Sequence, residues 1–213
     1  MSRLSCHVLI TLNLSKSKEL KTMDTSKTLN WTKKRFFVAL VFAATTFAAS
    51  FVLGSGITLA FGSGTSGVAT IIITTVLIVI GGRVVETRGY FLVAVTLFTV
   101  LAIPTSMFGP PGPHKVIIGG LTGLVYDVIW DVTGRKRLSL PSAAAVSTAV
   151  SILLIYGLIV MFFPEYPKLE TLRRLLKYLV PAYGVLGFFG GMLGQWIYEK
   201  NLAHLSAIKM LKE

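Results

Sequence analysis

The sequence predicts an all-α membrane protein in which six transmembrane helices form a compact bundle and both termini lie in the cytoplasm. Of its 213 residues, 53% are hydrophobic and 14% are charged, whereas a soluble domain carries roughly a quarter charged residues. Mean hydropathy is correspondingly high, at +0.72. Long uncharged runs, and an uneven distribution of basic residues between them, are the other observations that lead to this fold class.

The uncharged runs supply the helices. They cover Phe36 to Gly82, Gly89 to Pro113, Leu138 to Pro164 and Tyr178 to Tyr198. A membrane-spanning helix needs about 20 mostly apolar residues, because hydrocarbon accepts only a backbone whose hydrogen bonds are satisfied internally. The first run is too long for one helix, and the clustered glycine and serine of GSGITLAFGSGTSG (54–67) predict a loop that divides it. The expected spans are therefore 36–53, 66–82, 89–105, 115–131, 141–163 and 178–198.

Basic residues orient these spans. In this layout, 16 of the 21 lysines and arginines lie on the side of the two termini. The positive-inside rule places that side in the cytoplasm. Residues 1–35 are then a polar, basic cytoplasmic leader, 36–200 a transmembrane domain, and 201–213 a short cytoplasmic tail. Between spans five and six, leucines at helical spacing in LETLRRLLKYL (169–179) predict a short amphipathic helix on the outer surface.

Two features of the N-terminal region leave alternatives open. Met23 is a second candidate for the first residue, since residues 1–22 show no structural pattern. The stretch KKRFFVALVFAATTFAAS has features of a signal peptide, but its apolar part is longer than most, so we expect a retained helix.

Several function classes are disfavoured. Cys6 is the single cysteine, so neither a disulfide within the chain nor a cysteine-based metal site is expected. The net charge of +12 fits contact with anionic membrane lipids better than contact with nucleic acid. GTSG (64–67) matches the G-x-S-G of intramembrane serine proteases, yet no histidine is expected opposite Ser66 on a facing helix. We therefore expect no enzyme activity, no catalytic residue, no metal and no cofactor.

Two groups of residues in the spans favour structural roles. Asp127 and Asp131 are four apart on one helix face, near the expected cytoplasmic end, where Arg83, Arg88 or Arg135 can pair with them. Structural anchoring is the favoured interpretation, although acids inside a membrane are functional candidates. The glycines between residues 184 and 194 predict a sixth span packed closely among its neighbours.

The outer loops are the best candidates for function. All three are longer or more specialised than the cytoplasmic turns, and loops held by a rigid scaffold concentrate functional residues. Phe108, Tyr156, Tyr166 and Tyr183 can face the outer half and line a small-molecule cavity. Interface anchoring of Tyr166, and core packing of Tyr156 and Tyr183, are the alternatives.

The layout resembles the substrate-binding S component of energy-coupling factor (ECF) transporters, over residues 36–200. The resemblance rests on six spans, cytoplasmic termini, the Ala44-x-x-x-Ala48 pair, and the glycine-rich segments GPHKVIIGGLTGLVYD and GVLGFFGGMLGQWIYEK. The long lysine-rich leader and the basic loop between spans five and six are departures. The N-terminal metal-binding histidine of cobalt and nickel S components is missing.

This resemblance implies a function and its residues. Ala44 and Ala48 would dock onto a transmembrane coupling subunit, which works with ATP-binding subunits. A vitamin-like small molecule would bind at His114, Lys115, Tyr156, Tyr166 and Tyr183 in a multi-pass protein of the cell membrane. Basic residues near the rim would favour an anionic substrate, or else contact lipid. The alternatives are a structural or assembly membrane protein without a ligand and a stand-alone secondary transporter.

Overall fold

The computed structural model describes residues 31–61, 63–134, 138–167, 169–205 and 208, with only the backbone described at 61 and 63–66. The leader, with Cys6, His7 and Met23, lies outside the described residues up to position 30, as does the side chain of Ser66. The chain divides into two units, Met1–Trp31 and Thr32–Glu213. All that follows concerns the second unit.

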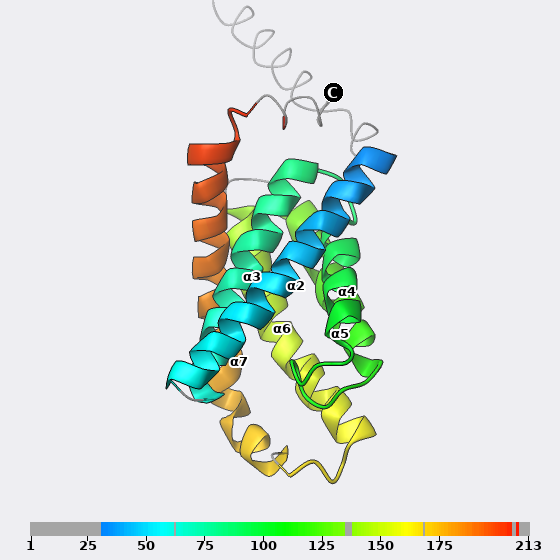
Figure 1. The fold of residues 1–213 in the computed structure, drawn as a ribbon, viewed down its shortest axis with the longest axis vertical. Helices are drawn as coiled ribbons and strands as arrows, with labels where there is room; N and C mark the ends of the chain where they lie inside the picture. Colours follow the sequence, from blue (N-terminus) through cyan, green and yellow to red (C-terminus); the bar gives the residue numbers. More distant parts are fainter. Residues whose placement is uncertain (1–30, 62, 135–137, 168, 206–207, 209–213) are drawn as a thin grey trace, which may run out of the picture. The chain divides into compact units, whose positions relative to one another are not determined.

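Every regular element in the described part of the chain is helical (Figure 1). The elements are α2 (Lys33–Phe61), α3 (Ser63–Val85), α4 (Tyr90–Ala102), α5 (His114–Val132), α6 (Ser139–Phe162), α7 (Leu169–Ile197) and a closing π-helical turn η1 (Tyr198–Leu202). Four stretches within the described residues are long and apolar enough to cross a membrane. These are Lys33–Ala60, Gly67–Val85, Ser139–Phe162 and Leu169–Leu202. The predicted all-α class, compatible with a membrane protein, is confirmed.

The helices pack side by side in a closed order. α2 packs against α3, α3 against α7, α7 against α6, α6 against α5, α5 against α4, and α4 returns to α2. Successive helices run in opposite directions, so the segments that join them alternate between the two ends of the bundle (Figure 1). The joins between α2 and α3, α4 and α5, and α6 and α7 share one end, which is called the loop end below.

The predicted loop at 54–67 is wrong. α2 continues to Phe61 and α3 begins at Ser63, so nearly the whole of GSGITLAFGSGTSG is helical. Glycine in this segment serves close packing: a Cβ at Gly54 would lie 2.8 Å from the Thr70 hydroxyl oxygen of α3. In an apolar setting the helix also satisfies backbone groups that an open loop would leave without partners, which outweighs the weak helix propensity of glycine.

The predicted amphipathic helix before the sixth span is present, but it is not a separate surface element. It forms the first turns of α7, which runs without interruption from Leu169 to Ile197 and contains Pro181. Leu172, Leu176 and Leu179 pack against the buried cluster that includes Ile155 of α6. The leucine stripe therefore contacts protein, and this packing explains why the segment lies along α6.

Glycines let α7 lie close to two neighbours, as the sequence predicts. A Cβ at Gly187 would lie 2.7 Å from the Ala144 carbonyl oxygen of α6. A Cβ at Gly194 would lie 2.7 Å from the Val76 carbonyl oxygen of α3. Contacts this short exclude any side chain, so these positions set the spacing of α3, α6 and α7.

Candidate functional site

α5 caps the N-terminal end of α4 through a carboxylate. The backbone N–H of Leu92 donates to Oδ2 of Asp127 at 2.8 Å. Gly89, which precedes the first residue of α4, has a φ of 76° and provides no side-chain cap of its own. The Asp127 carboxylate thus supplies the acceptor and negative charge that a helix N-terminus favours. Gly123 allows this approach, because a Cβ there would lie 2.5 Å from the Phe91 carbonyl oxygen.

The same helix caps the opposite end of α4 through an ammonium group. Lys115 is fully buried, and its Nζ donates to the carbonyl oxygens of Ala102 at 3.0 Å and Thr105 at 2.5 Å. Ala102 is the last residue of α4, so the cation lies where the helix dipole is negative. Lys115 and Asp127 are about 18 Å apart along α5, which matches the roughly 20 Å length of α4.

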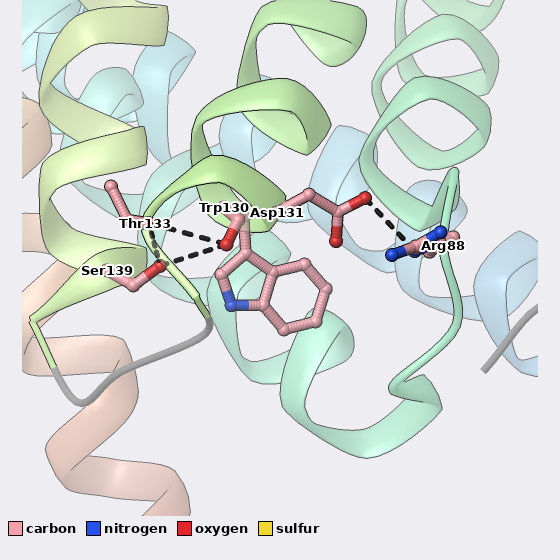
Figure 2. Close-up of polar contacts among 5 residues, drawn as sticks. All are labelled: Arg88, Trp130, Asp131, Thr133 and Ser139. Atoms are coloured by element: carbon pink, nitrogen blue, oxygen red, sulfur yellow. Dashed lines mark hydrogen bonds and ion pairs between the residues drawn. The ribbon is translucent and has the colours of Figure 1, made fainter. Parts of the chain in front are cut away.

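Asp131 joins α5 to the turn before α4, at the end of the bundle opposite the loop end. Its Oδ2 lies 3.2 Å from Nε of Arg88, in the turn before α4 (Figure 2). Figure 2 also shows the side chains of Thr133 and Ser139 in contact, with both hydroxyls directed to the Trp130 carbonyl oxygen at 3.3 Å. These bonds join the end of α5 to the start of α6. The expected anchoring role of the two aspartates thus fits their contacts.

The segment 103–113 folds back over the bundle at the loop end. The Gly112 N–H donates to the Ile103 carbonyl oxygen at 3.1 Å, which closes the loop on itself. Phe108 has a φ of 61°, a left-handed conformation that is costly for a residue with a side chain. Its ring lies edge-on to Phe98 of α4, with centroids 5.8 Å apart. The loop therefore holds an aromatic ring over the interior.

Beneath Phe108 lies a cavity of about 90 Å³ between four helices, called the inner recess. Its lining combines apolar side chains with hydroxyl groups from α3, α4, α5 and α6. The serine and threonine residues around it are Thr70, Thr74, Thr75, Thr99, Thr122, Ser147, Thr148 and Ser151, and Tyr126 also lines it. The recess is large enough to hold several water molecules or a small chemical group.

A second cavity of about 380 Å³, called the vestibule, lies between the inner recess and the loop end. Five residues line both cavities: Thr70, Ile71, Phe108, Ser151 and Ile155. The vestibule also contacts Ser106 and Gly109 of the folded-back loop and Tyr166 of the join between α6 and α7. Because they share these five lining residues, recess and vestibule adjoin, and together they are called the chamber below, with Phe108 at the boundary between them.

The structure brings together only part of the predicted binding set. Tyr166 and Tyr183 both line the vestibule, as does Phe108. His114 and Lys115 are buried at the start of α5 and are not lining residues of the chamber. The His114 ring lies edge-on to Phe163, with centroids 5.2 Å apart. Tyr156, which is half-buried on α6, also lies outside the chamber lining.

The predicted partner residues lie on the outside of the bundle. Ala44 and Ala48 are both exposed on α2, while Ala43, Thr46 and Ser50 are buried on its opposite face. The alternative that the alanine pair serves packing within the chain has no support from these positions. Large apolar side chains extend the same exposed face, including Phe37 at 63% and Val52 at 65% exposure.

The hydroxyl lining of the recess is the feature that sequence reasoning missed. Thr70 and Thr74 are four apart on α3, and Ser147 and Ser151 are four apart on α6, so each pair shares a helix face. Such pairs inside apolar spans were the available signal. These pairs did not by themselves indicate a binding site, however, because threonine and serine in helices often bond only to their own backbone.

No protein-family model matches this chain, and no curated protein or solved structure was found to be similar to it. The class is therefore defined by the fold and the chamber alone. The described part of the chain is all-helical, with four helices long and apolar enough to cross a membrane and two adjoining cavities between the helices.

Proposed function

We propose that this protein is a membrane-embedded capture subunit that binds a small molecule in the chamber. The observation that carries the proposal is that vestibule and recess share five lining residues and so adjoin one another between the loops and the interior of the bundle. Small-molecule sites are concave, mostly apolar and equipped with a few polar groups, and the chamber has this composition. Tyr166, Tyr183 and Phe108 are the proposed contacts in the vestibule.

The proposal includes six membrane spans with both termini in the cytoplasm. In this proposal α4 and α5 are two further spans beside the four apolar helices. α4 has no charged side chain, and the buried Lys115 and Asp127 of α5 bond to the ends of α4. α4 spans only about 20 Å, less than the roughly 30 Å of a hydrocarbon core. Figure 1 shows α6 and α7 extending beyond the loop that joins α4 and α5.

The short α4 places the loop 103–113 at membrane depth in this arrangement. Irregular backbone at that depth is tolerated where it is buried in protein or lines a polar cavity. The loop meets this condition, since Ser106, Met107, Phe108 and Gly109 line the vestibule. The chamber is thus the reason that a proline-rich loop can replace the last turns of a spanning helix.

A coupling subunit is the proposed partner, as in the S components that the sequence resembles. The exposed alanine pair of α2 supports this role, since small residues allow a second helix to approach closely. ATP hydrolysis by further subunits would then drive release of the captured molecule. The chain itself would perform binding and not catalysis.

The first experiment asks whether the chamber holds a molecule. Native mass spectrometry of the protein, purified in mild detergent, should show a retained small molecule. Ser151→Phe should abolish this extra mass, because residue 151 lines both cavities and a phenyl group would fill the passage between them. Leu153→Phe is the matched control, since Leu153 lies on the same helix and is 45% exposed.

Equal retention by both variants would contradict the chamber as the binding site. Absence of any retained mass in all three proteins would favour the ligand-free structural alternative. The partner is tested separately by co-purification, which Ala44→Leu and Ala48→Leu should abolish while Ala182→Leu, at an exposed alanine of α7, leaves it intact. A partner that co-purifies with all three variants would contradict docking through α2.

A further inference from the structure

The inner recess has a mixed but wholly uncharged lining. Among the described residues, neither the recess nor the vestibule is lined by lysine, arginine, histidine, aspartate or glutamate. The basic residues of α7 near the loop end do not approach it: Arg174 is exposed and pairs with Glu170 at 3.1 Å, and Lys177 lies over the Tyr178 ring. Any group that enters the chamber therefore meets hydroxyls, aromatic rings, aliphatic carbon, the Met107 thioether and glycine backbone, and no charged side chain.

Three of the hydroxyls around the recess already donate to backbone carbonyl oxygens. Thr99 donates to the Val95 and Thr96 carbonyl oxygens of its own helix. Thr148 donates to the Tyr183 carbonyl oxygen of α7 at 2.9 Å, and Ser151 donates to the Thr148 carbonyl oxygen at 2.7 Å. These hydroxyls stabilise helices and have little donor capacity left for a guest.

Two hydroxyls of the recess differ from the rest. The oxygens of Thr122 on α5 and Ser147 on α6 are buried, and the structure of the described residues gives neither a hydrogen-bond partner. Ser147 is only 1% exposed. A buried hydroxyl without a partner is costly, so native proteins satisfy such groups with protein, water or ligand. Both residues line the same cavity from different helices, and a group placed between them would satisfy both.

The absence of charge from the lining sets the chemistry of that group. Moving an ionised group from water into an apolar cavity is strongly unfavourable unless an opposite charge compensates it. The chamber offers no such charge, whereas hydroxyls can donate to and accept from a neutral amide, carbonyl or hydroxyl. The recess accordingly selects against carboxylates, phosphates and ammonium groups.

We propose that the captured molecule is uncharged and has two parts: a compact hydrogen-bonding head held between Thr122 and Ser147, and a flat apolar body beside Phe108, Tyr166 and Tyr183. This inference rests on the proposed capture function and names its substrate class. The volumes agree with such a division, since the recess measures about 90 Å³ and the vestibule about 380 Å³. Aromatic rings around the vestibule favour a planar body by stacking.

The first test removes each hydroxyl while keeping the shape of the side chain. Benzamide, with a neutral amide head on a flat ring, is the probe, and its Kd is measured by ligand-observed NMR on protein stripped of retained molecules. Thr122→Val and Ser147→Ala should each raise this Kd by about tenfold, as loss of one hydrogen bond to a buried group predicts. Thr122→Ser, which keeps the hydroxyl, should stay within about threefold of wild type. Unchanged binding in Thr122→Val and Ser147→Ala would overturn the assignment of the head group.

The second test varies the charge and needs no variant. Benzamide, benzoate and benzamidinium are nearly isosteric but neutral, anionic and cationic. Benzamide alone should raise the unfolding temperature of the stripped protein. An equal shift with either charged probe, or no shift with any of the three, would overturn the proposal.

The molecule retained during purification separates this inference from the capture function. A neutral molecule, identified by mass spectrometry after its release, supports both. A charged molecule that Ser151→Phe fails to retain would leave the capture function standing and overturn the inference about charge. Loss of the capture function itself would appear as no retained molecule in wild-type protein.

Discussion

Asp127 shows how a single acid inside an apolar bundle can serve structure. Its carboxylate accepts from the Leu92 N–H at the start of α4, where backbone N–H groups have no partners within the helix. Asp131, one turn further along α5, instead pairs with the Arg88 side chain, and both of these side chains are partly exposed. Two acids on one helix face therefore make different kinds of contact.

This difference predicts unequal effects of substitution. Asp127→Ala should lower the free energy of unfolding by about 1–2 kcal/mol, because a helix N-terminus loses its cap and charge partner. Asp131→Ala should lower the free energy of unfolding by less than about 1 kcal/mol, since it removes a partly exposed ion pair. Thermal or denaturant unfolding in detergent measures both. Equal losses in the two variants would contradict the capping role of Asp127.

The sequence indicated the anchoring of these acids but only one of the partners. Arg88 was among the arginines expected to pair, and Asp131 does pair with it. The partner of Asp127 could not be predicted, because it is a backbone group brought into reach by close packing at Gly123. A residue's spacing along a helix does not reveal which neighbour comes near enough to bond.

At the scale of elements, α4 and α5 form one unit held at both ends. Asp127 caps the start of α4 and Lys115 caps its end, so α5 matches the dipole of α4 with a negative and a positive side chain. This arrangement explains why a helix with two buried charged residues lies beside one with none. It also fixes the loop 103–113, because Lys115 bonds to the Thr105 carbonyl oxygen as well.

Lys115 is therefore expected to contribute to stability. Lys115→Met should lower the free energy of unfolding by about 2 kcal/mol, the amount expected when buried carbonyls lose hydrogen bonds to a charged donor. Lys115→Arg is the control that keeps the charge. Unfolding in detergent provides the measurement, and a Lys115→Met protein as stable as wild type would show that the two carbonyl bonds contribute nothing.

Glycines at two helix positions should respond to alanine with opposite signs. Gly187→Ala should destabilise the protein by more than about 1 kcal/mol, because its Cβ would lie 2.7 Å from a backbone carbonyl oxygen of α6. Gly157→Ala should stabilise it by about 0.5–1 kcal/mol, because a Cβ there meets nothing within 4 Å and alanine favours the helix. If the two substitutions change the free energy of unfolding in the same direction, the tight packing of α7 is contradicted.

The elements also show where sequence patterns reach their limit. Spans three, four and five were predicted within three residues of α4, α5 and α6 at each end, since Pro104 and the charged turns delimit them. The segment 54–67 was predicted as a loop because glycine and serine favour loops in water. Gly54 instead packs against Thr70, and that contact depends on a neighbouring helix that the local sequence does not show.

At the scale of the whole molecule, the closed order of helices leaves a chamber near the loop end. The sequence pointed to the outer loops and to Tyr166 and Tyr183, which do line the vestibule. It did not single out Thr122 or Ser147, because hydroxyls in apolar spans are common, alone or in pairs, and only their place in the lining of one cavity distinguishes these two. Composition fixes the class of such a protein, whereas the site depends on long-range packing.

The proposed membrane orientation is tested by labelling single cysteines in a Cys6→Ser background. Glu165→Cys, at an exposed position in the join between α6 and α7, should react with a membrane-impermeant maleimide on intact cells. Asn201→Cys, exposed beyond α7 at the opposite end, should react only after the cells are permeabilised. The reverse labelling pattern would show that the protein has the opposite orientation, with the loop end in the cytoplasm.

Whether the chamber holds a small molecule is best decided by an experimental structure of the protein as purified from its membrane. A bound antibody fragment would make a chain of this size suitable for cryo-electron microscopy. We expect density that belongs to no residue, in contact with Phe108 and Tyr183 and extending inward to Thr122 and Ser147. A chamber closed by those side chains, with no space between them, would rule out the proposed binding site.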